Sequence, residues 1–556
     1  MNRIASSVAA LALASSLAAG AGVEPEACAW PMFGHDPGRS FAQSPECSGI
    51  SRTNAATLLP AWAVLTADNI SASPSVVDGV LYVGSWDGTF YAIDAETGEQ
   101  LWTFAVDDSH EVAFGRIVST AAVGAVDVPG VGPVPAVIFG GGGTLYALAP
   151  GRTGPTVLAK INVDPREQAL RDQQADNPPQ IEIESSPVVG HFADGDRIFV
   201  GMDVHNRSGV GRTGMLAFGL RANDGGPEPY RFEFLYKHDP ETGMVRHSLT
   251  EGSGEGFGCG GVWSSPSLDQ SALGGRGIVV YGTSNCDNPD ESAAAGEIGR
   301  EAMIAIDATS GEELWRFQPR EPNDLDDDFG STPNMLPGGA VGIGGKDGWY
   351  YARDLESGAE RWSTRAGQSG RLNSGFAVGG FIGVPAVGRA TDPISGVERD
   401  VIFGVTALPT PFAKPLDSGG NPLDTTLVQD PGRLFSLHAI DAATGDILWR
   451  SPLAAPAYGH VSYANGVVFA SVTFGVRLQA FDAATGLPLW IMPTFGAPSS
   501  SPVLLGDMLF TGTGTRETDL EFKAFGDQLQ GLLSGPLGEH PLSRLSGVFG
   551  YRLAGA

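Results

Sequence analysis

Positive charge and cysteine are both scarce in this sequence. Lysine and arginine total 34 residues against 63 aspartates and glutamates, which gives a formal net charge of −29. So acidic a surface disfavours nucleic acid and anionic membranes as binding partners. The chain has 4 cysteines, and none stands in a Cys-x-x-Cys-His arrangement. A c-type haem attached to this chain is therefore excluded.

Long hydrophobic runs are absent beyond the start of the chain. Residues 1–21 contain one early positive charge, Arg3, followed by an apolar stretch over 8–19 and small residues at 19–21. This pattern predicts an export signal that is removed on maturation and is too short to cross a bilayer. We therefore expect a single mature domain of residues 22–556, periplasmic or secreted, with no membrane span.

An oxidising compartment would allow the four cysteines to form two disulfides. Sequence proximity favours Cys28 with Cys47 and Cys259 with Cys286, although spacing alone leaves the other pairings open. The segment around the first pair, residues 28–50, is rich in proline and glycine and has no clear periodicity. We expect it to form a strap that lies on the rest of the fold.

What the sequence does contain is one stretch repeated with fixed internal spacing. An aspartate is followed after eight residues by a tryptophan in YAIDAETGEQLW (91–102), IAIDATSGEELW (304–315), YARDLESGAERW (351–362), HAIDAATGDILW (438–449) and QAFDAATGLPLW (479–490). Each copy predicts a strand, a tight turn and a second strand that ends in the indole. The aspartate oxygen can accept amide hydrogens of the turn, and the glycine supplies the positive φ that the reversal needs.

A hairpin cannot bury its apolar face alone, so copies at intervals of roughly 40 to 60 residues predict stacked sheets. Radial repetition of four-stranded sheets satisfies this requirement and leaves only short edges. The sequence therefore predicts an all-β fold, an eight-bladed β-propeller with tryptophan-docking repeats, although seven blades remain an alternative. Seven sheets are expected over residues 73–104, 117–162, 184–237, 262–318, 331–365, 376–452 and 459–492, with Ala159 replacing tryptophan in the second and a degraded repeat in the third.

The eighth sheet is predicted to combine strands from both termini. LLPAW (58–62) resembles the last strand of a sheet whose partners lie elsewhere, and we expect these partners at 499–514 and 547–553. Such a shared sheet would keep the ring from opening.

Three segments carry residues that a packing repeat does not require. They are GCGGVWSSPSLD with IVVYGTSNCDNPD (258–290), PNDLDDDFGSTPNML (322–336) and GGKDGWYYARD (344–354). Together with the repeat and the opening AWPMFGHD (29–36), these segments resemble quinoprotein alcohol dehydrogenases, in particular the polyvinyl alcohol dehydrogenase-like branch. The resemblance covers essentially the whole mature chain. It implies an eight-bladed propeller that holds pyrroloquinoline quinone (PQQ) on its axis.

The resemblance also implies roles for particular residues in cofactor binding. Trp263 would be the surface on which the flat quinone stacks, Lys346 would reach the quinone oxygens, and Arg116 would pair with a cofactor carboxylate. Fixed cations suit a cofactor with three carboxylates. The rival readings are a core indole for Trp263, a surface lysine for Lys346 and a salt-bridge partner for Arg116.

A second set of residues would hold a metal and move a proton. The resemblance implies that Asn285, Asp326 and Asp328 bind calcium or a lanthanide, and that Asp326 is the catalytic base. Oxygen ligands suit a hard cation that polarises the quinone carbonyl, and a neighbouring carboxylate can take the alcohol proton. The rival readings are a turn-forming asparagine and a solvated acidic loop.

The sequence departs from the family pattern near the metal. Where the family has a glutamate ligand, residues 200–214 offer Asp203, His205 or Asn206 and no glutamate. The pair of adjacent cysteines found over the quinone in many members is absent, and Leu325 stands where a tryptophan usually precedes the catalytic aspartate.

The functional prediction is a PQQ-dependent oxidation of an alcohol, secondary or polymeric in the resembling branch, with electrons passed to a separate acceptor such as a cytochrome c. The main alternative is a noncatalytic exported propeller that serves as a binding or assembly scaffold. A third hypothesis is a module that binds sugars or polymers.

Overall fold

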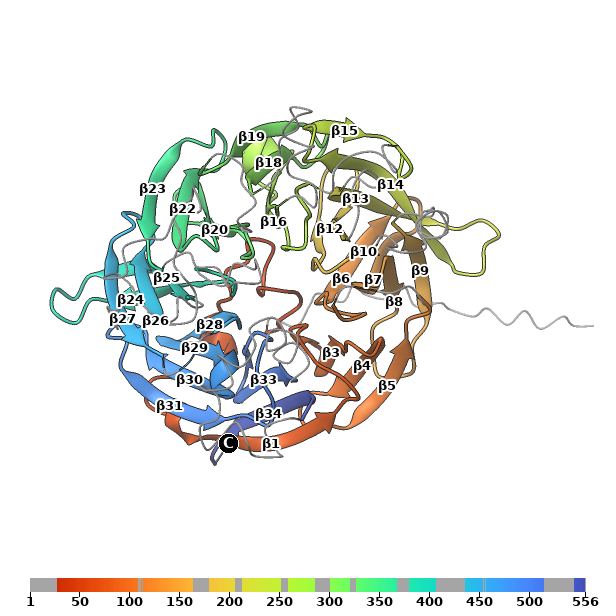
Figure 1. The fold of residues 1–556 in the computed structure, drawn as a ribbon. Coiled ribbons are helices and arrows are strands. Elements are labelled where there is room, and N and C mark those ends of the chain that lie inside the picture. Colours follow the sequence, from red (N-terminus) through yellow and green to blue (C-terminus); the bar gives the residue numbers. More distant parts are fainter. Residues whose placement is uncertain are drawn as a thin grey trace, which may run out of the picture.

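The chain forms a closed ring of eight antiparallel sheets around a central axis (Figure 1). This computed structural model describes residues 28–108, 112, 114–163, 180–205, 213–251, 259–285, 301–320, 327–367, 380–406, 436–453, 455, 457–514 and 545–555. Within these ranges helix is limited to α2 (Ala272–Gly275) and to the 3₁₀ turns η1 (Pro45–Cys47), η2 (Ala55–Thr57) and η4 (Thr473–Gly475). The prediction of an eight-bladed, all-β propeller is confirmed.

Six blades are four-stranded antiparallel meanders in which neighbouring strands follow one another in the chain. Blade 1 contains β2 (Ser75–Val77), β3 (Val80–Gly84), β4 (Thr89–Asp94) and β5 (Gln100–Ala105), and blade 2 contains β6 (Ala122–Val128), β7 (Gly132–Gly141), β8 (Thr144–Leu148) and β9 (Val157–Asn162). Blade 4 contains β16 (Ser267–Asp269), β17 (Ile278–Gly282), β18 (Met303–Asp307) and β19 (Glu313–Phe317), and blade 5 contains β20 (Asn334–Leu336), β21 (Ala340–Gly344), β22 (Trp349–Asp354) and β23 (Glu360–Arg365). Blade 6 contains β24 (Ala386–Thr391), β25 (Glu398–Val405), β26 (Ser436–Asp441) and β27 (Ile447–Pro452), and blade 7 contains β28 (Val461–Ala464), β29 (Val467–Val472), β30 (Arg477–Asp482) and β31 (Pro488–Pro493).

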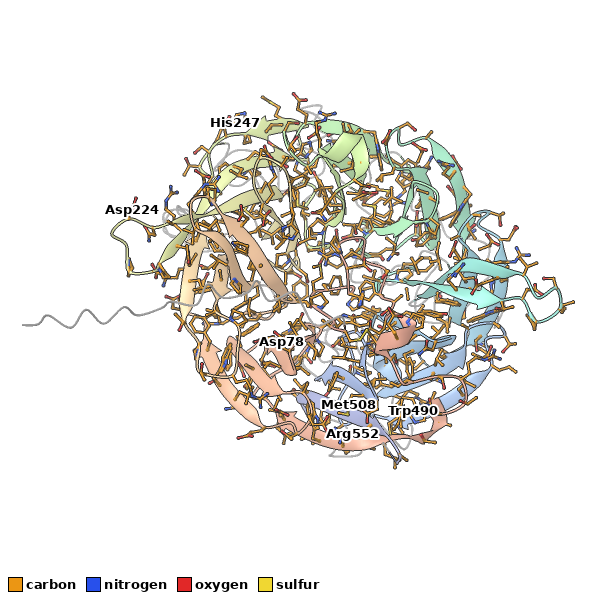
Figure 2. The ribbon with its side chains drawn as sticks, turned by 180° about the vertical axis from the view of Figure 1, so that it is seen from behind. Asp78, Asp224, His247, Trp490, Met508 and Arg552 are labelled. Atoms are coloured by element: carbon orange, nitrogen blue, oxygen red, sulfur yellow. A yellow bond between two sulfur atoms is a disulfide. The ribbon has the colours of Figure 1, made fainter. Side chains whose placement is uncertain are left out.

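Blade 3 has six strands. They are β10 (Gln180–Glu182), β11 (Val188–Gly190), β12 (Arg197–His205), β13 (Gly214–Ala222), β14 (Tyr230–Asp239) and β15 (Met244–Arg246). Both β10 and β11 pair with the long strand β12, and β15 extends the sheet beyond β14. The hairpin between β13 and β14, with Asp224 near its tip, projects beyond the ring (Figure 2).

Blade 8 closes the ring with strands from both ends of the described chain. β32 (Val503–Leu505), β33 (Met508–Thr513) and β34 (Gly547–Leu553) are completed by β1 (Leu58–Leu65), which pairs antiparallel with β34. The indole of Trp490, on the neighbouring blade, donates to the carbonyl of Leu58 at 3.2 Å. Figure 2 shows Trp490, Met508 and Arg552 together at this closure. The predicted closure is confirmed.

The repeated tryptophans dock each blade onto the next. The indole N–H of Trp362 in blade 5 donates to the carbonyl of Ala442 in blade 6 at 3.1 Å, and a Cβ on Gly445 would lie 2.6 Å from the indole. The same pairing joins an indole to the following blade at Trp62 with Ala95, Trp315 with Leu355 and Trp449 with Ala483. The turn glycine therefore has two duties, because it adopts a positive φ and leaves room for the ring.

The two blades without a docking tryptophan differ from each other. In blade 3, the hydroxyl of Tyr236 donates to the carbonyl of Ala308 at 2.7 Å, and its ring packs against Gly311 of blade 4. Tyr236 thus replaces the tryptophan, since a phenol also combines a large ring with a donor at its tip. In blade 2 the corresponding residue is Ala159, which lies opposite Ala147 in the sheet.

Residues 28–50 form a strap on the axis, visible in red at the centre of Figure 1. Its carbonyl and amide groups pair with the inner strands in ring order at Trp30 with Val76, Pro31 with Val123, Pro37 with Leu268, Gly38 with Met335, Ser40 with Val387, Phe41 with Tyr463 and Gly49 with Gly506. The Arg39 guanidinium, completely buried, supplies the contact with blade 3 through the carbonyls of Ser186 and Pro187. The strap therefore touches every blade.

The predicted disulfide between Cys28 and Cys47 is present and joins the two ends of this strap. Trp30 lies on blade 1, and the amide of Gly506 in blade 8 donates to the carbonyl of Cys47. The disulfide therefore closes the strap into a covalent circle where the first and last blades meet. Cys286, the predicted partner of Cys259, lies outside the described residues, so the second pairing stays a prediction.

Hydroxyl groups before the innermost strands tie neighbouring blades together near the axis. Each accepts a hydrogen bond from the matching amide of the preceding blade, at Ser73 with Thr120, Thr120 with Ser186, Ser186 with Ser265, Ser265 with Thr332 and Ser501 with Ser73, over 2.8 to 3.1 Å. These links satisfy backbone donors that a strand start would otherwise leave open. The axial ends of blades 8, 1, 2, 3, 4 and 5 are thereby fixed relative to one another.

We predict that an alanine at Gly445 destabilises the protein more than an alanine at Gly396. Both glycines end an Asp-x-x-(Ser/Thr)-Gly turn in blade 6, with φ of 77° and 72°, but a Cβ at Gly396 meets nothing within 4 Å. Gly396→Ala should cost about 1 to 2 kcal/mol through backbone strain alone. Gly445→Ala should cost a further ~1 to 3 kcal/mol because the Cβ strikes the docked indole of Trp362. Denaturant midpoints compare the two variants, and equal losses would contradict the double role of the docking glycine.

Candidate active site

Chain topology brings four of the predicted site residues to one end of two adjacent blades. Trp263 and Asp328 precede the innermost strands β16 and β20, whereas Asn285 and Lys346 follow the second strands β17 and β21. In an antiparallel sheet the start of one strand and the end of the next lie at the same end. All four residues therefore lie at the same end of blades 4 and 5, whose innermost strands β16 and β20 face the centre of the ring in Figure 1.

Trp263, Asp328 and Lys346 form one contact cluster, which we call the axial cluster. The indole N–H of Trp263 donates to Oδ2 of Asp328 at 3.2 Å, and Nζ of Lys346 lies 2.6 Å from Oδ1 of the same carboxylate. The ammonium lies 5.7 Å from the centroid of the Trp263 ring. The carboxylate side chain is 3% exposed and that of Lys346 is 12% exposed, so this ion pair is shielded from solvent. The structure thus brings three of the predicted site residues into contact.

Small residues and backbone contacts allow this approach. A Cβ on Gly330 would lie 2.7 Å from the Trp263 ring, so glycine lets the chain after Asp328 pass along the edge of the indole. The amide of Lys346 donates to the carbonyl of Asp328 at 3.1 Å. Gly380, with φ of 62°, packs against the Lys346 turn, where a Cβ would lie 2.2 Å from the carbonyl of Gly345.

Asn285 lies in a neighbouring segment that is tied to the start of blade 4. Its carbonyl accepts from the amide of Gly260 at 3.1 Å, and the amide of Ser284 donates to the carbonyl of Gly261 at 2.9 Å. A Cβ on Gly261 would lie 2.0 Å from Oδ1 of Asp203 and 2.6 Å from the hydroxyl of Ser284. Of the three residues offered in place of the family's glutamate, Asp203 is thus buried beside the Asn285 segment, while Asn206 lies outside the described residues.

Arg116 is not joined to the axial cluster. Arg116 precedes β6 and so lies at the same end of blade 2, where its guanidinium donates to the carbonyl of Asp108 at 2.9 Å. Within the described part of the chain, no contact connects Arg116 with Trp263 or Lys346. Asp326, the predicted catalytic base, lies outside the described residues, so its role stays a prediction.

The sequence analysis overlooked a set of buried charges behind the cluster. The Arg320 guanidinium donates to Oδ2 of Asp347 at 2.6 Å and lies within ion-pair distance of Glu301 and Asp327. Burial alone would lower the pKa of Arg320, but the three carboxylates raise it above its ordinary value. Burial and then Asp347 also raise the pKa of the Tyr351 hydroxyl. In the sequence, Asp347 and the glycine after it indicate only a turn. The one further signal for Asp347 as a site residue is its position next to Lys346.

The eight-bladed, tryptophan-docked ring places this chain among the β-propellers, and the fold is shared with solved structures of quinohemoprotein and methanol dehydrogenases. A family model described as PQQ, glucose/ethanol/alcohol dehydrogenase β-propeller domain, matches residues 30–342. That match spans more than half of the chain, and the chain belongs to this family of PQQ-dependent dehydrogenases. A second model, described as outer membrane protein assembly factor BamB, matches residues 299–387 and 417–524, which together are less than half of the chain.

Curated relatives and solved structures agree with this assignment. Lupanine 17-hydroxylase [cytochrome c] from Pseudomonas sp is 23% identical over 508 residues, which are 82% of this chain and 68% of that protein. Polyvinylalcohol dehydrogenase from Pseudomonas sp is 23% identical over 506 residues, which are 84% of this chain and 70% of that protein. A europium-containing methanol dehydrogenase shares the fold with a TM-score of 0.63 at 16% identity, covering 95% of this chain and 98% of the other. A quinohemoprotein alcohol dehydrogenase from Comamonas testosteroni has a TM-score of 0.62 at 16% identity, covering 95% and 81%.

None of the helices among the described residues has the length and hydrophobicity that a bilayer span requires.

We predict that Asp328→Asn destabilises the protein and changes the environment of Trp263. The substitution keeps the side-chain shape but removes the negative charge that faces Lys346. Breaking a buried ion pair in this way should cost about 3 kcal/mol or more. Thermal unfolding measures the loss, and a shift in the emission that disappears in a Trp263→Phe background reports on the indole.

The matched control is Glu398→Gln. Glu398 pairs with Arg389 at 3.0 Å on the surface, where the two side chains are 50% and 62% exposed. Exposed pairs contribute little, so this variant should differ from the parent by less than about 1 kcal/mol. If Asp328→Asn is as mild as the control, the axial cluster is not a buried ion pair.

Proposed function

We infer that the chain is an exported quinoprotein that uses PQQ to oxidise an alcohol at the axial cluster. The observation that supports this most is the meeting of Trp263, Asp328 and Lys346 from blades 4 and 5 at one end of the propeller. The docked indoles already provide the packing between these blades, so the convergence needs another reason. A binding site for a flat, anionic cofactor provides one.

The side chains of the cluster suit PQQ. Trp263 is only partly buried and offers an aromatic surface for stacking, and Lys346 supplies a positive charge beside that ring. Arg116, at the same end of blade 2, would supply a second cation for a cofactor carboxylate. When bound, PQQ supplies a carbonyl carbon that accepts the hydride of the alcohol. The cluster would hold and orient this group and keep water from it.

A hard cation would be held next to the quinone. Asn285, Asp326 and Asp328 provide the amide and carboxylate oxygens that calcium or a lanthanide prefers. Asp203, buried beside the Asn285 segment, would take the place of the glutamate used elsewhere in the family. Such an ion acts as a Lewis acid on a carbonyl oxygen. Which of the two kinds of ion is bound is a question for reconstitution.

Asp326 would be the general base that removes the hydroxyl proton of the alcohol. Four of the five residues from 324 to 328 are acidic, and the described part of that run, Asp327 and Asp328, is buried. A base in this position could take a proton while Lys346 and Asp328 keep the site electrostatically balanced.

The relatives suggest the substrate class, the acceptor and the compartment. One relative is named for polyvinyl alcohol and another for a cytochrome c acceptor. We propose a small or polymeric alcohol, secondary alcohols included, as substrate and a separate cytochrome c as electron acceptor. The signal predicted at residues 1–21 would deliver a single-domain mature chain of residues 22–556 to the periplasm or the medium.

Reconstitution tests this function directly. Purified protein is mixed with PQQ and either calcium or lanthanum, desalted, and assayed by dye reduction with primary, secondary and polymeric alcohols. Retained quinone absorbance together with alcohol-dependent dye reduction is the expected result. Protein that retains no quinone with either metal would refute the proposal and support a noncatalytic scaffold.

We predict that Asp326→Asn lowers turnover by roughly 100- to 10,000-fold, because positioned proton transfer contributes a factor of that size. Quinone retention after desalting should remain, which separates loss of the base from loss of the cofactor. Asp324→Asn, in the same acidic run, is the control and should keep most of the activity. Equal losses in the two variants would remove Asp326 from its role as base.

A further inference from the structure

Arg320 connects three segments that meet at the proposed site. It lies three residues after the end of β19, and one nitrogen, Nη1, donates to Oδ2 of Asp347 at 2.6 Å. Its Nη2 donates to the backbone carbonyl of Asp327, and its Nε lies 3.4 Å from Oε2 of Glu301. A planar guanidinium presents its donors in a fixed fork, so these contacts set the relative positions of their partners.

The first two contacts reach the axial cluster from both sides. Asp347 is the neighbour of Lys346, and its carboxylate also accepts from the hydroxyl of Tyr351 at 2.5 Å and from the amide of Trp349 at 3.1 Å. Asp327 is the neighbour of Asp328, whose carbonyl accepts from the amide of Lys346. Arg320 therefore contacts the chain neighbour of each partner in the Lys346–Asp328 ion pair. Through these neighbours it fixes the positions of both partners.

The third contact reaches the Asn285 segment. The amide of Glu301 donates to the carbonyl of Ser284 at 2.9 Å, next to Asn285. Glu301 has a φ of 50°, in the left-handed region that residues other than glycine adopt when their surroundings hold them there. Its carboxylate is buried and faces the Arg320 guanidinium. The same guanidinium thus also braces the segment that carries the proposed amide ligand.

The geometry of the axial cluster depends on the positive charge of Arg320. Glu301, Asp327 and Asp347 all place a carboxylate oxygen within 4 Å of Arg320, and all three side chains are largely buried. Without the positive charge, three carboxylates would face one another in a region of low dielectric constant, where like charges repel strongly. The segments that carry them would move apart, and the axial cluster would lose its geometry.

We propose that Arg320 is a positioning residue, which aligns Asp328, Lys346 and Asn285 for cofactor binding by holding Asp327, Asp347 and Glu301. This proposal rests on the proposed function for its consequence in cofactor affinity, but not for its consequence in the geometry of the cluster. Arg320 acts through other residues, because its contacts within the described part of the chain are with these three and none is with Trp263. Two separate measurements can therefore test it.

The first measurement follows the protein without cofactor. Acrylamide quenching of Trp263, obtained as the difference between each variant and the same variant carrying Trp263→Phe, reports how well the indole is shielded. Arg320→Met should lose much of this shielding. Arg320→Lys should keep part of it, because lysine retains the positive charge but lacks the planar fork of N–H donors. Asp347→Asn, which weakens the same link and keeps the arginine, should change quenching in the same direction and serves if Arg320→Met does not fold.

The second measurement is the dissociation constant for PQQ in the presence of calcium or lanthanum. Loss of residues that support ligands typically costs about 10- to 100-fold in affinity, and we expect Arg320→Met to fall in that range. Arg320→Lys should lie between Arg320→Met and the parent.

Arg316→Met is the matched control. Arg316 lies four positions earlier and is equally buried, with a side chain 9% exposed against 10% for Arg320, but it pairs with Glu313 and the carbonyl of Pro240. It should lose stability without changing Trp263 quenching or PQQ affinity. Wild-type values for both quantities in Arg320→Met would overturn the proposal. If the parent protein binds no PQQ, the proposed function fails, and the quenching result still decides whether Arg320 positions the cluster.

Discussion

The contact between a docked indole and the turn glycine of the next blade is the constraint on which the ring depends. At the junction of blades 4 and 5, the indole of Trp315 donates to the carbonyl of Leu355 and packs on Gly358 at the rim. The same two blades are joined again near the axis by Trp263, Asp328 and Lys346. Because the rim contact fixes the distance between the blades, the axial groups can meet without a flexible loop having to find them.

The fold could be predicted because its determinants are local and repeated. The eight-residue spacing from aspartate to tryptophan specifies a turn and an anchor within one hairpin, and the structure uses both as expected. Tyr236 escaped prediction because a single phenol outside the pattern gives no signal of periodicity. The path of the strap could not be predicted either, because residues 28–50 form hydrogen bonds with strands that are spread over the whole sequence.

The site was predicted only in part, and the reason lies in burial. Trp263, Lys346 and Asp328 could be selected because they break the repeat, and the structure brings them together. Arg320 and Glu301 could not, because a charged residue in a sequence gives no sign that it will be enclosed. Arg116 lies at the same end of the propeller as the axial cluster, but among the described residues it does not contact the cluster. Residues at the same end of their strands therefore share a level along the axis without having to touch.

The acidity of the chain and the anionic character of PQQ are compatible on physical grounds. The formal net charge of −29 belongs to the whole chain, and salt screens exposed charges over about 10 Å at 0.1 M ionic strength. Within the site the nearest charges dominate, and there Lys346 lies beside the proposed stacking surface. The sign of the whole protein and the sign of the charge beside Trp263 can therefore differ.

The circle formed by residues 28–47 has a consequence for biogenesis. Its binding partners are the inner strands of all eight blades, and the last of these, β32, begins at Val503. This segment is synthesised before the blades that bind it, and its binding surface is complete only when β32 has been made and packed into the ring. Contacts of such long sequence separation form slowly. The segment therefore reaches its final position only after all eight blades have formed.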